Sequence, residues 1–269
     1  MFNLLRMDLY RIKRSRSVYV CFGLLLLASA ATFFMVWLFE TPQGCEVAVK
    51  LGFDLSADEI IKESGTIAGL DMIGLYRQMG LNGGNYNVIF GIWLMLFVCM
   101  DYQSGFMKNT MALHENRALY VGSKLAAAGI VSLCYLVGQY LFVLFLDGVF
   151  GKVVAAGGIL DVAYYISWNW LMTTAFGALM LLVCILSRSV AAGALAAVLF
   201  GTGSIVMPVY MLLDKLHIGG WLKYSIYVTM STAPDHYASS ADVYVYAIGA
   251  GFLAVYAGAA AFVLKRQDI

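Results

Sequence analysis

The sequence predicts an all-α polytopic membrane protein with six transmembrane helices, and two observations carry that prediction. Hydrophobic residues make up 62% of the 269 residues and charged residues only 12%, far from the balance of a water-soluble domain. Six stretches of at least 22 residues also lack Asp, Glu, Lys and Arg, and each is long enough to cross about 30 Å of hydrocarbon as a helix. They are Ser17–Phe39, Gln78–Met100, Leu125–Leu146, Val162–Ser187, Ser189–Leu213 and Val243–Leu264. Because a soluble helix keeps a polar face, these stretches exclude a soluble fold, and we expect residues 1–269 to form a single transmembrane domain.

The first span follows a basic segment, residues 1–16. Phe2, Leu5, Leu9 and Ile12 fall on one helical face of this segment, which predicts an amphipathic helix lying in the membrane interface. A basic flank without fixed structure is an equally good interpretation of residues 1–8.

The charges between the spans orient the chain. The side that carries both termini has a net charge of +7, and the opposite side has a net charge of −6. Since Lys and Arg collect on the cytoplasmic side, we expect both termini to be cytoplasmic and the protein to lie in the plasma membrane.

Two segments on the opposite side are long enough to cover the membrane domain. Residues 40–85 form the larger outer loop, in which Ser56 and Glu59 match a helix capping box. Residues 214–242 are apolar and aromatic and include Trp221, which predicts short helices that dip into the outer interface between spans five and six. Irregular backbone at that depth must be covered by protein or line a wet cavity, so we place an outer gate in this re-entrant segment.

The fifth span contains a predicted hinge. Gly201 and Pro208 lie in its outer half, where a kink is expected. Small residues recur every four positions in this span and in the sixth, and such spacing lets helices approach closely, so we expect spans five and six to pack together. These residues are Gly193, Ala197 and Gly201 in the fifth span and Ala250, Ala254 and Gly258 in the sixth.

The sequence offers no catalytic or metal-binding group. The three histidines lie outside the spans, and no phosphate-binding loop of the Gly-x-x-x-x-Gly-Lys-Ser/Thr type occurs, so we expect no enzyme, no metal and no cofactor in this chain. Polar residues inside the spans mostly bond to their neighbours, but a minority of them are candidates for lining a substrate path. The candidates are Gln139, Asn169, Thr173, Thr202 and Ser204.

The inner connection at residues 101–124 is the one cytoplasmic loop long enough to receive another protein. Its polar residues alternate with Phe106, Met107, Met111, Leu113 and Leu119, which predicts a short amphipathic helix. A purely solvated loop would not need these apolar positions.

In this connection the sequence resembles the membrane subunits of type-two ATP-binding-cassette exporters. Asp101, Gly105, Arg117 and Lys124 match the family motif in kind and order, whereas Phe106 replaces its usual small hydroxyl residue and residues 114–116 replace its Pro/Ser segment. The resemblance implies that Phe106–Arg117 is a coupling helix that docks in the ATPase subunit. The implied coupling residues are Asp101, Gly105, Phe106, Lys108, Glu115, Arg117 and Lys124.

The same resemblance implies the partners and the activity. The chain is similar to permeases that export lantibiotics, bacitracin-like antibiotics or other amphipathic peptides, which pair with a second permease copy or a related permease and with cytoplasmic ATPase subunits. ATP and Mg would be bound by the ATPase, membrane lipid would surround the permease, and no nucleic acid is involved. The alternative is a six-span scaffold or assembly protein without transport activity.

Overall fold

The computed structural model describes residues 2–52, 71–78, 84–107, 117–151, 154, 157–215, 220 and 224–267, and these residues form helices without a strand. Five helices are long and apolar enough to span a membrane, namely α2 (Arg16–Glu40), α6 (Asn85–Gln103), α8 (Ala118–Val149), α9 (Ile159–Ser187) and α13 (Tyr244–Arg266). The pair α10 (Val190–Gly201) and α11 (Val206–Lys215) is bent by 49° at a short break and is long and apolar enough to count as a sixth, broken span. The chain is therefore an all-α polytopic membrane protein, as the sequence predicts.

Short helices complete the fold. The entry helix α1 (Phe2–Arg14) precedes the first span, and α12 (Ile226–Thr232) and the 3-10 helix η3 (Ser240–Val243) lie between α11 and α13. Within the predicted 40–85 loop the structure places α3 (Pro42–Lys50) and α5 (Met72–Tyr76). The Thr41 hydroxyl accepts a hydrogen bond from the Gly44 N–H at 3.0 Å, which caps α3. The predicted capping box at Ser56 and Glu59 lies outside the described residues.

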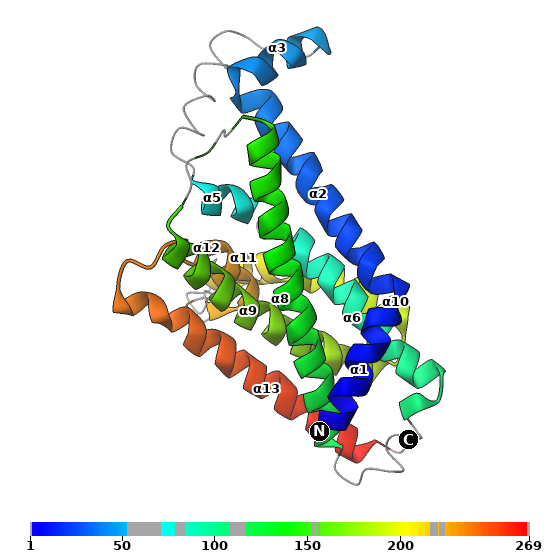
Figure 1. Ribbon diagram of the computed structural model, residues 1–269. Helices are drawn as coiled ribbons and strands as arrows, with labels where there is room; N and C mark the ends of the chain where they lie inside the picture. Colours follow the sequence, from blue (N-terminus) through cyan, green and yellow to red (C-terminus); the bar gives the residue numbers. More distant parts are fainter. Residues whose placement is uncertain are drawn as a thin grey trace.

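Both termini lie at one end of the helix bundle, where α1 also lies (Figure 1). We call this the terminal end, and the end that carries α3 and α5 the far end. α8 and α9 run through the middle of the bundle, α13 packs along α9, and α2 runs along the opposite edge (Figure 1). This arrangement agrees with an even number of membrane crossings.

The inner helices of the bundle are α6 and α9. In each of them, about 61% of the apolar 18-residue stretch that could span the membrane is buried within the protein. The corresponding share is 22% for α2 and 17% for α13. The Trp93 and Trp168 side chains, one from each inner helix, are fully buried. Most of the outward-facing surface of α2 and α13 is thus apolar and free of protein contacts, as expected for helices that face lipid.

The predicted contact between the fifth and sixth spans is wrong. α10 packs closely against α6 instead. The glycines permit this approach, since a Cβ added at Gly193 would overlap Met95 and one added at Gly91 would lie 2.8 Å from the Ala197 Cβ. α13 packs against α9, while Ala254 and Gly258 are exposed. Small residues in a lipid-facing helix permit a close neighbour but do not specify which helix it is.

A buried charge cluster as the candidate functional site

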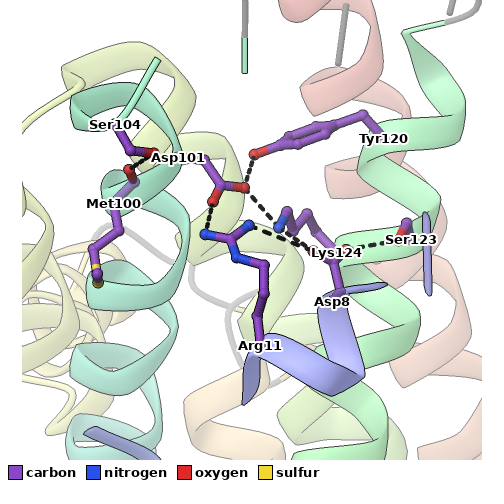
Figure 2. Close-up of polar contacts among 8 residues, drawn as sticks. All are labelled: Asp8, Arg11, Met100, Asp101, Ser104, Tyr120, Ser123 and Lys124. Atoms are coloured by element: carbon purple, nitrogen blue, oxygen red, sulfur yellow. Dashed lines mark hydrogen bonds and ion pairs between the residues drawn. The ribbon is translucent and has the colours of Figure 1, made fainter. Parts of the chain in front are cut away.

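Four charged side chains from three helices meet at the terminal end of the bundle (Figure 2). Lys124 of α8 contacts two carboxylates, with Nζ 2.6 Å from Asp8 Oδ1 of α1 and 2.6 Å from Asp101 Oδ2 of α6. Arg11 of α1 reaches the other oxygen of the same α6 carboxylate, with Nη2 2.7 Å from Asp101 Oδ1. We call these four residues the charge cluster. It joins the two ends of the inner connection to the entry helix.

The cluster is almost completely removed from solvent. Lys124 is 1% exposed, Asp101 0% and Asp8 2%, and only the Arg11 side chain, at 29%, reaches the surface. Taking charges out of water is costly unless they are paired. Two positive and two negative groups satisfy that condition, so the cluster as a whole is neutral.

Two hydroxyl groups also donate hydrogen bonds to the carboxylates. Tyr120 Oη donates to Asp101 Oδ2 at 2.9 Å, and Ser123 Oγ donates to Asp8 Oδ2 at 2.7 Å (Figure 2). Both donors come from the first two turns of α8, as does Lys124. One face of the first two turns of α8 therefore binds the carboxylates of both α1 and α6.

Aromatic rings also lie beside the two cations of the cluster. Lys124 Nζ lies 4.2 Å from the centre of the Phe97 ring, and Arg11 Cζ lies 4.4 Å from the centre of the Phe106 ring. Cations over ring faces are favourably placed, because the face carries partial negative charge. Phe106 is a position at which the sequence differs from the exporter motif that it resembles. Its ring lies over the Arg11 guanidinium.

The local sequence explains how each group reaches the cluster. Asp8 and Arg11 are three residues apart on α1 and so share one helical face. Asp101 is in the last turn of α6, after which Gly105 takes a left-handed backbone conformation (φ +69°) that favours glycine. The chain turns away there into the inner connection, and it returns at α8 with Lys124 in the second turn.

Arg117, a further predicted coupling residue, does not join the cluster. Its Nη1 donates to the carbonyl oxygens of Leu264 at 2.8 Å and Gln267 at 2.6 Å, at the C-terminus of α13. Carbonyls at a helix C-terminus lack partners within the helix and attract a cation. Arg117 therefore ties the end of the inner connection to the last span. The predicted coupling residues Lys108 and Glu115 lie outside the described residues.

The structure thus brings together Asp101, Lys124 and Phe106 of the predicted coupling set and adds Asp8 and Arg11, which sequence reasoning missed. One signal could have found them. Residues 1–16 contain five basic residues and a single acidic one, Asp8. A single carboxylate in a basic segment indicates that it pairs with a specific cation. The entry helix packs with Asp8 and Arg11 facing the bundle, because Lys124 and Asp101 neutralise their charges there.

Three of the predicted path residues are fully buried, and each makes a hydrogen bond to a neighbour, although the side-chain oxygens of Gln139 and Asn169 have no hydrogen-bond partner. Gln139 Nε2 donates to Ser29 Oγ of α2 at 2.8 Å, Thr173 and Ser132 hydroxyls are 2.6 Å apart between α9 and α8, and Asn169 Nδ2 donates to the Tyr165 carbonyl oxygen at 2.9 Å. They act as helix-to-helix or helix-internal contacts. Thr202 and Ser204 lie instead at the break between α10 and α11, where their hydroxyls are 2.6 Å apart.

The predicted hinge coincides with that break. Gly201 ends α10, Gly203 has a left-handed φ of +72°, and Pro208 lies in the first turn of α11. A Cβ added at Gly84 would overlap the Gly201 carbonyl, so the backbones of α6 and α10 touch beside the hinge. Trp221, the third predicted gate residue, lies outside the described residues.

A second group of polar contacts, with one Arg–Asp ion pair, lies at the far end and was also missed. His236 Nε2 lies 3.2 Å from Asp71 Oδ2, and its Nδ1 lies 3.5 Å from Asp161 Oδ2. Arg77 pairs with Asp235 and donates to the Ala233 carbonyl oxygen at 2.9 Å. These contacts join α5, the start of α9 and the segment after α12.

No group of three or more His, Cys, Asp and Glu side chains in the described part of the chain is placed to hold a metal ion. No family model matches the sequence, and no curated protein compared with it is similar.

Proposed function

We propose that this chain is the membrane-spanning permease subunit of an ATP-binding-cassette exporter that moves amphipathic peptides or antibiotics out of the cell. A separate cytoplasmic ATPase would bind ATP and Mg and dock on the inner connection. In this proposal the terminal end faces the cytoplasm, the far end faces outward, and the membrane is the plasma membrane.

The charge cluster is the observation that carries the proposal. It fixes both ends of the inner connection to each other through Asp101 and Lys124, and to the entry helix through Asp8 and Arg11. Arg117 attaches the same connection to α13. A displacement of the inner connection would therefore move α1, α6, α8 and α13 together. An ATPase docked on this connection could transmit its movement to the membrane helices in this way.

Copurification tests the proposal directly. The chain, tagged at an exposed far-end position and isolated from its native membranes in mild detergent, should bring down an ATPase subunit in a stoichiometric amount. ATP hydrolysis by the isolated complex should respond to amphipathic peptides. Recovery of the chain without any ATPase would contradict the proposal.

Two substitutions test the docking segment itself. Glu115→Arg and Gly105→Leu should leave the protein inserted in the membrane but reduce peptide-stimulated ATP hydrolysis at least tenfold. Gly151→Leu is the matched control for the glycine, because Gly151 follows α8 at the far end, also has a left-handed backbone (φ +98°) and has open space around it. Equal stimulation in the Gly105 and Gly151 variants would count against coupling through this segment.

One observation favours the alternative, a six-span scaffold without transport activity. Gln139 bonds to Ser29 of α2 and Thr173 bonds to Ser132 of α8, and such links between helices are expected for a static bundle. The copurification experiment separates the two functions, because a scaffold has no need for an ATPase.

A further inference from the structure

A half-open pocket of about 260 Å³ lies at the terminal end of the bundle, where α1, the turn into α2 and the last two turns of α6 meet. Its volume is far above the roughly 10–15 Å³ that a single water needs. One wall is apolar and belongs to α6, and the other walls carry polar side chains. The lining residues are Phe97 and Met100 of α6, Tyr10, Arg11 and Arg14 of α1, and Ser15 of the turn.

The pocket has one cation that the protein does not neutralise. Arg14 is exposed, and none of the ion pairs formed within the described part of the chain includes it. Arg11 is different, because it belongs to the neutral charge cluster through its pair with Asp101 (Figure 2). None of the six lining residues is acidic. Arg14 is therefore the group whose charge a ligand would neutralise.

Contacts within the entry segment fix the position of Arg14. Its Cζ lies 5.0 Å from the centre of the Tyr10 ring, four residues earlier on the same face of α1. The Tyr19 hydroxyl of α2 donates to the Lys13 carbonyl oxygen at 2.9 Å, which ties the end of α1 to the start of the first span. The guanidinium thus stands beside the pocket at the point where the chain enters the span.

The pocket lies at the edge of the apolar layer and opens away from the bundle. The first span begins at Arg16, and Phe97 and Met100 belong to the spanning stretch of α6. Met100 is 53% exposed and Tyr10 is 58% exposed. On a membrane-spanning chain, lipid tails contact exposed apolar side chains, and lipid headgroups contact the basic and aromatic residues next to them. A ligand that fits this pocket therefore joins an acidic group to an apolar one.

We propose that the pocket binds an anionic phospholipid, with the phosphate paired to Arg14 and the first carbons of an acyl chain over Phe97 and Met100. A guanidinium presents paired N–H donors that match a phosphate group. Every phospholipid has a phosphate, but the amine of a zwitterionic headgroup would find no carboxylate among the lining residues. An unpaired arginine instead favours a headgroup with net negative charge. The proposal rests on the membrane-spanning fold and not on the proposed function.

Two lipids with the same acyl chains and different headgroups test the proposal. The full chain, purified in mild detergent and freed of lipid, is titrated with palmitoyl-oleoyl phosphatidylglycerol or with palmitoyl-oleoyl phosphatidylcholine. Native mass spectrometry counts the lipids that remain bound. The first phosphatidylglycerol should bind about fivefold more tightly than the first phosphatidylcholine, as expected for one unneutralised cation.

Two variants and one competitor assign this preference to the pocket. Arg14→Gln should remove the preference, because it removes the unpaired guanidinium. Arg6→Gln is the matched control and should keep the preference, since Arg6 is an exposed arginine of the same helix that does not line the pocket. Glycerol 3-phosphate, which has the phosphate without acyl chains, should not displace the bound lipid at tenfold excess. Size-exclusion profiles verify that both variants are folded.

Equal affinity of the parent for the two lipids would overturn the proposal, as would a preference that survives Arg14→Gln. A preference lost equally in Arg6→Gln would show attraction to the basic segment as a whole and would also overturn it. Displacement by glycerol 3-phosphate would mark a site for soluble anions and overturn the assignment to lipid. None of these measurements needs an ATPase, so a failure here is distinguishable from a failure of the proposed function.

Discussion

Lys124 illustrates how one side chain depends on residues that are distant in sequence. The family motif predicted Asp101 and Lys124 as functional positions, but it gave no indication that the amine would be 1% exposed between two carboxylates. The motif covers only the inner connection, whereas Asp8 comes from the entry helix. A pattern in one segment predicts which residues matter there, and the burial of their charges depends on the partners that the fold supplies.

Replacing Lys124 with Met should lower the free energy of unfolding by about 3–5 kcal/mol, because two buried carboxylates would then share only Arg11. Reversible unfolding in mixed micelles measures the loss. Adding Asp8→Asn to this variant should restore part of the stability by removing one unpaired charge, in the manner of a double-mutant cycle. Lys265→Met, at an exposed position of α13, is the control and should change stability little. A double variant as unstable as the sum of its single variants would contradict this account.

At the scale of the helix, the break between α10 and α11 could be predicted, because Gly201 and Pro208 interrupt an otherwise apolar span. α6 begins at Asn85, inside the uncharged stretch Gln78–Met100 and after Asn and Gly residues that disfavour a helix. The helix that packs on α10 could not be predicted. Lipid tails are as apolar as side chains, so hydrophobic pattern alone does not choose between α6 and α13.

The contact between α6 and the hinge predicts the effect of one glycine. Gly84 has a left-handed φ of +77°, and a Cβ there would overlap the Gly201 carbonyl. Gly84→Ala should therefore destabilise the protein by about 2–4 kcal/mol, through backbone strain and overpacking together. The matched control is Gly251→Ala on α13, where a Cβ meets nothing within 4 Å and which should be neutral or slightly stabilising. Thermal unfolding of the two variants side by side measures the difference, and a loss of the same size in both would refute the close contact.

At the scale of the whole molecule, the apolar helices, which number five or six depending on whether the bent pair is one span, the presence of a helix at residues 2–14 and the position of both termini at one end agree with expectation. The face that α1 buries differs from the predicted one, because it includes Leu4, Asp8 and Ile12 and leaves Phe2 exposed. The points of agreement follow from the length of the apolar stretches and the charge between them, which are properties of the sequence itself. Cys45, at the far end of the bundle after the first span, is not a freely exposed loop residue. Cys45 lies on α3 but is only 6% exposed, and its Sγ donates to the Phe39 carbonyl oxygen at 3.3 Å.

Because Cys45 is buried, it is a poor site for labelling. The orientation of the chain in the membrane is therefore tested with cysteines introduced at exposed positions. In a Cys45→Ser background, Lys50→Cys on the exposed end of α3 should react with an impermeant maleimide in intact cells. Lys265→Cys at the terminal end should react only after the membrane is permeabilised. The reverse pattern would place the termini outside.

Assembly is the second prediction at this scale. If two permeases meet about the membrane normal through the first, second and fifth spans, the exposed faces of α2 and α10 supply the contact, because α6 is mostly covered within one copy. Leu195→Cys on α10, 60% exposed, should then crosslink between two copies of a homodimer, and Val255→Cys on α13, 64% exposed, should not. If the partner is a related permease, the Leu195→Cys crosslink should instead form to that protein. A complex that contains one copy of this chain and no second permease would exclude the dimer.

The charge cluster has a consequence for how the chain is made. Asp8 leaves the ribosome 116 residues ahead of its partner Lys124, which takes roughly 6–20 s at ordinary synthesis rates. During that interval α1 has two spans behind it but no cation from α8 to neutralise its carboxylate, so the helix must wait in the wet headgroup layer. It can dock only when the third span arrives. The entry helix is thus synthesised well before its partner on α8 and can take its final place only after the third span has arrived.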